Sequence, residues 1–113
     1  GLSRRMRFDL VVNLLTAKAV RDGQITLFGG DQWRPFVHVD DVALGIVRVL
    51  QARRAQVHNQ IFNLGSDEQN YTLREAGELI QGLVPGSEAV ELGRDGDPRN
   101  YRVSFAKIRN CLD

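Results

Sequence analysis

Residues 30–46 read GDQWRPFVHVDDVALGI, and this stretch decides how the chain folds. A glycine turn comes first, PFVHV at 35–39 reads as a short strand, and two aspartates then precede an apolar helical pattern. Pro35 is expected at the start or the edge of its strand. Asp40 or Asp41 is expected to cap the helix, because a short carboxylate accepts the free N–H groups of a first turn. The predicted buried stripe of this helix consists of Val42, Ile46, Val47 and Leu50.

Helical and strand patterns alternate on both sides of this stretch. Gly23 stands where a helix-ending glycine belongs, Thr72 and Glu75 form a T-x-x-E capping box, and Ser104 can cap a last helix. QIFNLG at 60–65 has little polar alternation, so it is predicted to be a strand covered on both faces. The alternation favours an α/β fold with mixed short strands and about four helices. Helical patterns cover 8–20, 42–50, 73–83 and 105–112, and strand patterns cover 25–28, 35–39, 60–65 and 88–92.

The composition is that of an ordinary globular protein. Of the 113 residues, 42% are hydrophobic and 26% are charged, which argues against disorder. No apolar run approaches the roughly 18 residues of a membrane helix, and the first residues lack the pattern of a signal peptide. The single cysteine, Cys111, excludes an internal disulfide and fits a reducing compartment, so we expect a cytoplasmic location. A net charge of +1 with interspersed signs gives no reason to expect nucleic acid or a membrane surface as partner.

Two further stretches complete a pattern that begins with residues 30–46: IFNLGSDEQNYTLREAGELI at 61–80 and DPRNYRVSFAKI at 97–108. In register, the three resemble the extended short-chain dehydrogenase/reductase family, which includes the NAD-dependent nucleotide-sugar epimerases and dehydratases. The first resembles the family's G-x-Q-x-R-x-[FY]-[IV]-x-V-x-D-[VL]-[AC] stretch, the second its last sheet strand, substrate loop and next helix, and the third its C-terminal segment. The resemblance implies that residues 1–113 are the C-terminal, substrate-binding segment of such a Rossmann-type enzyme.

Two motifs of that family are missing from these residues. There is no glycine-rich G-x-x-G-x-x-G turn for the NAD pyrophosphate, and no Y-x-x-x-K pair, because Glu75 follows Tyr71 and Phe105 follows Tyr101 at the lysine position. The resemblance implies NAD in the complete enzyme, with NADP left open, and an isomerase or lyase reaction through transient oxidation of a sugar carbon. We therefore expect no catalytic residue, no bound cofactor and no turnover in this segment alone.

The ends of the sequence suggest that the segment was cut from a longer chain. A basic cluster at 4–7 leads straight into a helical pattern, and the last residues stop within another. The partner implied is the missing N-terminal NAD-binding part. Without that part we expect exposed apolar surface and self-association of the segment.

Arg34 and Arg99 are the main candidates for substrate contacts. The planar fork of an arginine suits phosphate oxygens, and the resemblance implies that Arg34 grips the nucleotide diphosphate. The alternative is a surface arginine paired with Asp31 or Asp40. Arg99 lies in a loop bounded by glycine and proline, and the resemblance favours it over Arg102; a solvated loop arginine is its alternative. The two guanidinium groups, at 34 and 99, are predicted to converge on a spot sized for a pyrophosphate.

Five other residues complete the predicted substrate site. The resemblance places Thr26, Leu27 and Phe28 beside the nucleotide base, although ordinary core packing accounts for Phe28 equally well. Gln32 either reaches the ribose or holds its loop. Tyr101 is the tyrosine that precedes the family's lysine-bearing helix.

Several other polar residues receive structural interpretations. Asp9 is expected to cap the first helix, because its negative charge makes it a poor phosphate ligand, and His38 is expected to be a core or interface histidine. Gln69 and Asn70 fall in a loop that often contacts the nucleotide in the family, with a solvated turn as the simpler interpretation. No spacing of cysteine, histidine and carboxylate residues indicates a metal site.

Two other functions compete with the nucleotide-sugar enzyme. One is a non-catalytic interaction module with the same fold, and the other is a reductase of the superfamily with a non-nucleotide substrate. The sequence leaves open the sugar, the base, the choice between epimerase and dehydratase, and the oligomeric state.

Overall fold

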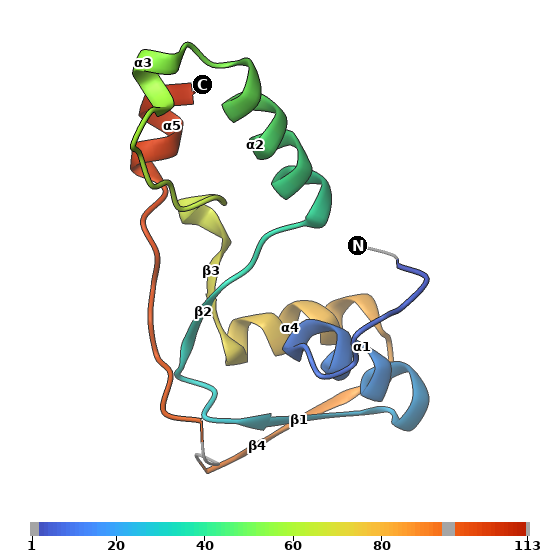
Figure 1. Ribbon diagram of the computed structural model, residues 1–113. Coiled ribbons are helices and arrows are strands. Elements are labelled where there is room, and N and C mark those ends of the chain that lie inside the picture. The colour runs from blue at the N-terminus through green and yellow to red at the C-terminus, as the bar shows by residue number, and fades with distance from the viewer. Residues whose placement is uncertain (1–2, 94–96, 113) are drawn as a thin grey trace. The chain divides into compact units, whose positions relative to one another are not determined.

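The computed structural model describes residues 3–93 and 97–112 and shows an α/β chain (Figure 1). The predicted fold class is confirmed, with four longer helices and one unpredicted short helix, α3. No helix within the described ranges is long and apolar enough to cross a membrane. The elements are α1 (Val11–Asp22), β1 (Gln24–Phe28), β2 (Trp33–Pro35), α2 (Val39–Gln51), α3 (Arg54–Val57), a 3-10 turn (Asp67–Gln69), β3 (Asn70–Thr72), α4 (Leu73–Leu83), β4 (Glu88–Leu92) and α5 (Ala106–Leu112).

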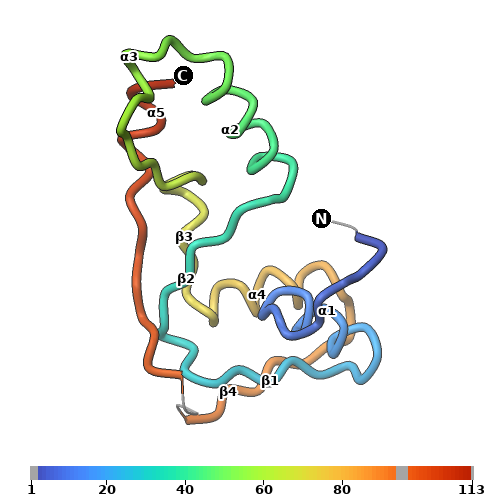
Figure 2. Tube along the Cα trace, viewed as in Figure 1, coloured from blue at the N-terminus to red at the C-terminus, as the bar shows by residue number. Residues whose placement is uncertain are grey.

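The chain divides into two compact units. The sheet unit consists of the described residues up to Arg34 together with Tyr71–Tyr101, and it contains α1, β1, α4 and β4. The helical unit consists of Pro35–Asn70 and the described residues from Arg102 onward, and it contains α2, α3 and α5. The trace in Figure 2 passes between the units after Arg34, after Asn70 and after Tyr101. The first two passages fall within β2 and β3, which pair as a two-stranded sheet.

The sheet unit contains the hydrophobic core. β1 and β4 pair in parallel, from Gln24 opposite Glu88 to Phe28 opposite Leu92, and α1 and α4 pack against β1 and against each other (Figure 1). Side chains alternate along a strand, so Ile25 of β1 points into the core and is fully buried. The core cluster consists of Leu15, Ala19, Ile25, Leu27 and Ile80.

The first helix ends as predicted but begins later. Gly23 adopts a left-handed φ of 66°, and its N–H donates to the carbonyl of Ala19 at 3.1 Å. The helix begins at Val11, and Asp9 is not its cap, which corrects the prediction. The Asp9 carboxylate instead pairs with the guanidinium of Arg7 at 2.6 Å, a charged partner two residues away.

The capping box of α4 is confirmed. The hydroxyl of Thr72 accepts from the backbone N–H of Glu75 at 3.2 Å, and the Glu75 carboxylate accepts from the N–H of Thr72 at 2.7 Å. The apolar residues of α4 are only partly buried, because Leu79 and Leu83 are exposed. The buried members are Leu73, Ala76, Gly77 and Ile80.

A close approach between α4 and β1 predicts opposite effects for two glycines of the same helix. A β-carbon at Gly77 would lie 2.9 Å from a methyl carbon of Leu27, whereas one at Gly82 would meet nothing within 4 Å. Alanine favours a helix over glycine by about 0.5–1 kcal/mol. We therefore expect Gly82→Ala to raise the midpoint of thermal unfolding. Gly77→Ala is expected to lower it, since Leu27 is itself buried and has little room to move. Equal shifts for the two variants would contradict the close approach.

The helical unit corrects two predictions about residues 38–41. His38 is the N-cap of α2, and its Nδ1 accepts from the N–H of Asp40 at 3.2 Å, so neither Asp40 nor Asp41 is the cap. Both aspartates lie in the first turn, where a negative charge favours the positive end of the helix dipole. His38 is not a core histidine, because 52% of its side chain is exposed.

Two predicted strands are also wrong. The strand expected at 35–39 lies at Trp33–Pro35 instead, because the chain turns into α2 at Val39. Residues 60–65 form no strand, because a strand requires a hydrogen-bonded neighbour and none pairs with them in the described chain. The pattern at 60–65 shows that these residues are apolar, but an apolar stretch forms a strand only where another strand pairs with it.

Three of the four residues of the predicted buried stripe of α2 are exposed in the described chain, and the fourth, Val42, is half-buried. Ile46 is 54% exposed, Val47 is 45% exposed and Leu50 is 79% exposed, and α2 has no buried residue. Phe105 is the single hydrophobic residue that is buried among the described residues of the helical unit. An amphipathic helix of this kind normally covers its apolar face. Within this unit Phe62, Leu64 and Ile108 line a cavity together with Ile46 and Leu50, but they leave both residues more than half exposed.

Candidate functional site

The first candidate site is a cluster of charged residues in the sheet unit, where residues 97–101 run beside β2. The backbone N–H of Trp33 donates to the side-chain oxygen of Asn100 at 2.9 Å. The N–H of Tyr101 donates to the carbonyl of Trp33 at 3.4 Å. These two contacts hold the loop that carries Arg99 next to the strand that carries Arg34.

The two arginines meet at one carboxylate. Oδ2 of Asp97 lies 3.3 Å from Nη2 of Arg34 and 2.7 Å from Nη2 of Arg99. Hydrogen bonds from the Arg99 side chain and then from its backbone hold the pKa of Asp97 far below its usual range, and the charges of Arg99 and Arg34 contribute further. Asp97 in turn raises the pKa of Arg99 through the same side-chain hydrogen bond and its charge. The carboxylate is therefore ionised at neutral pH and occupies a point at which two cations converge.

The Arg34 side chain is largely buried and makes several contacts, which argues against a solvated surface arginine. Only 13% of its side chain is exposed. Nη1 donates to the carbonyls of Trp33, at 2.8 Å, and of Arg99. Nη2 donates to Oε1 of Gln32 at 3.3 Å as well as to Asp97.

The ring of Tyr101 borders the same guanidinium. The Arg34 Cζ atom lies 5.9 Å from the centre of this ring, a cation–π distance. Tyr101 is 46% exposed, so the ring forms one side of the cluster and is also accessible to solvent.

Of the two interpretations of Gln32, the contacts favour the one in which it holds its loop. The side chain is 4% exposed, and its Nε2 donates to the backbone carbonyl of Asp97 at 2.7 Å. Gly29, at φ 65°, lies so close that a β-carbon there would be 3.1 Å from Gln32 Cδ. Gln32 therefore supports both Arg34 and the main chain of Asp97 from below the surface.

The three residues predicted to border the base lie on β1, in the same unit. Leu27 belongs to the core, with 4% exposed, and Thr26 is half-buried and lies opposite Val90 in the parallel pair. Phe28 is 41% exposed, so core packing does not account for it. Its ring is available to a ligand, whereas Leu27 can contribute only main-chain atoms.

Sequence reasoning missed Asp97 and Asn100, which connect the loop to β2. In the helical unit, Asn70 is 8% exposed, so it is not part of a solvated turn. Asn70 donates to the carbonyl of Val103 at 3.0 Å and accepts from the N–H of Val103 at 2.9 Å. A usable signal for Asp97 was its position two residues before Arg99. Asn70 had no such signal, because Val103 is 33 residues away.

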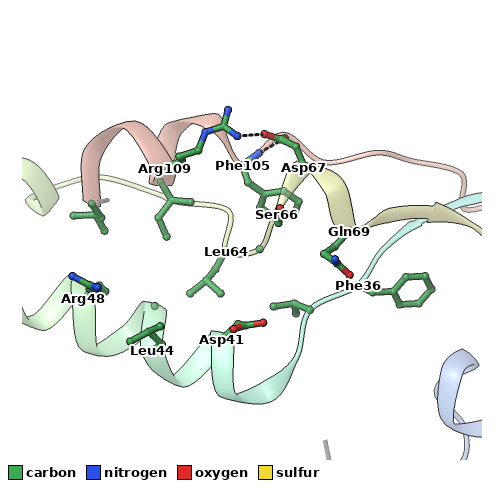
Figure 3. A pocket seen from close by; sticks show the side chains of 15 residues that line it. Phe36, Asp41, Leu44, Arg48, Leu64, Ser66, Asp67, Gln69, Phe105 and Arg109 are labelled. Atoms are coloured by element: carbon green, nitrogen blue, oxygen red, sulfur yellow. Dashed lines mark hydrogen bonds and ion pairs between the residues drawn. The ribbon is translucent and has the colours of Figure 1, made fainter.

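A second candidate site is a cavity of about 400 Å³ in the helical unit (Figure 3). Asp41, Leu44 and Arg48 line one side from α2, and Arg109 lines the other from α5. Across from α2, Asp67 pairs with Arg109 at 3.4 Å. None of the predicted substrate-binding residues lines this cavity. Gln69, from the loop that often contacts the nucleotide in the family, does line it.

The charge and geometry of the arginine cluster are suited to the binding of anions. In the described ranges, no group of three or more histidine, cysteine or carboxylate residues could hold a metal ion. A pair of neighbouring guanidinium groups with an aromatic ring alongside suits phosphate oxygens.

Comparison with known proteins places the chain in a family. The model of the NAD dependent epimerase/dehydratase family matches residues 3–65, more than half of the 113 residues. The fold is similar to that of an NAD dependent-NDP-hexosamine 5,6-dehydratase, TunA, involved in tunicamycin biosynthesis, with a TM-score of 0.76 and 20% identity over 94% of this chain and 34% of that one. It is also similar to PbgP3 protein from Burkholderia pseudomallei, with a TM-score of 0.70 and 22% identity over 90% of this chain and 32% of that one.

These identities carry information about the fold alone, and this chain spans about a third of the length of either protein, at 34% and 32%. The match of the family model covers α1, β1, β2, α2 and α3, and so includes Arg34 and the stretch at 30–46 from which the fold was predicted. The chain belongs to the NAD-dependent epimerase/dehydratase family.

Proposed function

We propose that these 113 residues form the substrate-binding segment of an NAD-dependent nucleotide-sugar epimerase or dehydratase, with the diphosphate held by Arg34 and Arg99. The observation that carries the proposal is the convergence of both guanidinium groups on one carboxylate oxygen, at 3.3 and 2.7 Å. An oxygen of a diphosphate offers the same charge-assisted hydrogen bonds as that carboxylate oxygen. Tyr101 borders the pair, and the exposed ring of Phe28 is available to the base.

The described residues do not fit the nicotinamide cofactor. Gly29 and Gly30 follow β1, but the chain then enters β2 rather than a helix whose N-terminus could receive a pyrophosphate. The sequence also has no Y-x-x-x-K pair. The proposal therefore assigns the cofactor, and with it the hydride transfer, to another part of the complete enzyme. The segment alone is expected to be inactive.

The exposed face of α2 supports this division of labour. Ile46, Val47 and Leu50 are large apolar residues with roughly half or more of their surface open to solvent, at 54%, 45% and 79%. A patch of this kind marks a surface that another part of the protein covers. We propose that the NAD-binding part of the enzyme covers this face.

This division predicts that the segment self-associates when it is produced alone. Covering the face of α2 removes apolar surface from water, and a second copy is the available partner. We expect light scattering to show a mass that rises with protein concentration. The variant Leu50→Glu should reduce this rise, and Leu83→Glu, an equally exposed leucine on α4 at 82%, is the matched control. A concentration-independent monomer would argue against a covered face.

Titration of the complete enzyme with nucleotides tests the diphosphate site directly. For each base, the nucleoside diphosphate should bind at least about tenfold more tightly than the monophosphate, because a second phosphate adds charge-assisted hydrogen bonds. Isothermal titration with the uridine, thymidine, guanosine, cytidine and adenosine series would measure this ratio. Equal affinities across every series would favour the reductase with a non-nucleotide substrate.

A further inference from the structure

We propose that Asp97 is an internal anion that occupies the Arg34–Arg99 pair in the absence of substrate and that a diphosphate binds by displacing this carboxylate. The inference rests on the proposed function, because it assigns to Asp97 the position that a phosphate oxygen takes in the complex. It adds a residue that sets how strongly, and for which anions, the site binds.

The contacts of the Asp97 side chain are those of a bound anion. Its Oδ2 accepts hydrogen bonds from Nη2 of Arg34 at 3.3 Å and from Nη2 of Arg99 at 2.7 Å. Its Oδ1 accepts hydrogen bonds from Nε of Arg99 at 2.9 Å and from the backbone N–H of Arg99 at 3.1 Å. A phosphate group binds guanidinium and backbone N–H donors in the same way.

The carboxylate can leave while the loop stays in place. The main chain of Asp97 is held separately, because its carbonyl accepts from Nε2 of the buried Gln32 at 2.7 Å. The side chain is 37% exposed, so water can solvate the carboxylate once it has rotated away from the arginines. Displacement therefore requires a rotation of one side chain and leaves the fold of the loop unchanged.

Charge decides which anions can compete with Asp97. Arg34 and Arg99 together carry two positive charges, and the carboxylate neutralises one of them. A singly charged anion offers no more than Asp97 already supplies from within the protein, at a far higher effective concentration. A diphosphate carries more charge and more acceptor oxygens, so it gains contacts that Asp97 does not provide. Asp97 thus suppresses the binding of singly charged anions and keeps the guanidinium groups of Arg34 and Arg99 in place.

The experiment compares Asp97→Asn with Asp22→Asn in the complete enzyme. Asparagine keeps the size of the side chain and one acceptor oxygen but removes the competing charge. Asp22 is the matched control, because it is an aspartate of the same unit that pairs with Arg21 at 2.7 Å on α1. The probes are inorganic pyrophosphate and uridine diphosphate, titrated calorimetrically. We expect Asp97→Asn to bind both about tenfold more tightly, and Asp22→Asn to bind them as the wild type does.

The same titrations separate this inference from the function on which it rests. If Asp97→Asn binds pyrophosphate equally or more weakly while Arg99→Ala loses affinity, the internal-anion role is overturned and the diphosphate site stands. If Arg99→Ala and Arg34→Ala both bind pyrophosphate like the wild type, the diphosphate site itself fails. A second measurement holds even if a variant is unstable. Infrared difference spectra of the wild type on addition of pyrophosphate should show an arginine-bound carboxylate becoming solvated, and no carboxylate change would overturn the inference.

Discussion

Alanine at position 34 is expected to weaken the binding of nucleoside diphosphate to the complete enzyme by about ten- to a hundredfold, since a charge-assisted hydrogen bond contributes about 1.5–3 kcal/mol. The side chain of Arg34 is less exposed than that of Arg99, at 13% against 70%. A partly buried charge is screened less by water and salt than an exposed one. Its loss should therefore affect a bound diphosphate more than the loss of a surface arginine. Equilibrium titration with the tightest-binding nucleoside diphosphate measures the change.

Because Arg34 also holds the loop, the experiment needs variants that separate contact from support. Arg34→Lys keeps the charge but not the planar fork, and we expect it to recover only part of the affinity. Arg21→Ala removes an exposed arginine of the same unit that pairs with its neighbour Asp22, and it should leave the affinity unchanged. Thermal unfolding identifies any variant that has lost its fold. A folded Arg34→Ala protein with the affinity of the wild type would refute the phosphate contact.

Truncating Ile25 should have the largest effect on stability. Ile25 is the residue of β1 with no exposed surface, and it lies in the core cluster with Leu15, Ala19 and Ile80. Ile25→Ala removes buried carbon atoms and leaves a cavity that the surrounding strand and helices can only partly close. The expected loss is about 2–5 kcal/mol in the free energy of unfolding.

Urea unfolding of the complete enzyme, followed by circular dichroism, measures this loss. Val20→Ala is the control, because Val20 lies on α1 with 70% of its surface exposed. Its effect should stay within about 0.5 kcal/mol. Equal losses for both variants would mean that the core of the sheet unit lies elsewhere.

The sequence was a better guide to the sheet unit than to the helical unit, for a physical reason. Local signals such as the glycine at 23 and the capping box at Thr72 act within a few residues, and both predictions were confirmed. The strands predicted at 25–28 and 88–92 were confirmed as β1 and β4, because each is the pairing partner of the other. The strand predicted at 60–65 and the buried stripe of α2 depend on neighbours that the described chain does not supply, so pattern alone misplaced them.

The sequence predicted the two arginines of the candidate site, Arg34 and Arg99, but not the carboxylate of Asp97 between them. The pattern at 30–46 and the loop position of Arg99 indicated both arginines, and the structure brings them together. The carboxylate between them lies 63 residues from Arg34 along the chain. The alternatives weighed for Arg34 were aspartates close to it in sequence, and a contact over such a separation leaves no local signal. The predictions for His38 and Asp9 failed for a local reason, because each side chain bonds to a residue two positions away, Asp40 for His38 and Arg7 for Asp9.

The chain passes three times between the two units, and this limits how either unit can be exchanged by recombination or transferred by protein engineering. Neither unit is encoded by one continuous stretch of gene, since each is completed by residues from both sides of Asn70. Recombination at a single breakpoint therefore cannot transfer one unit intact to another protein. A truncation from the C-terminal side that extends past Arg102 would likewise remove part of both units, so a lost activity could not be assigned to either. Grafting this binding loop onto another scaffold would require β2 and the segment around Arg99 to be moved together.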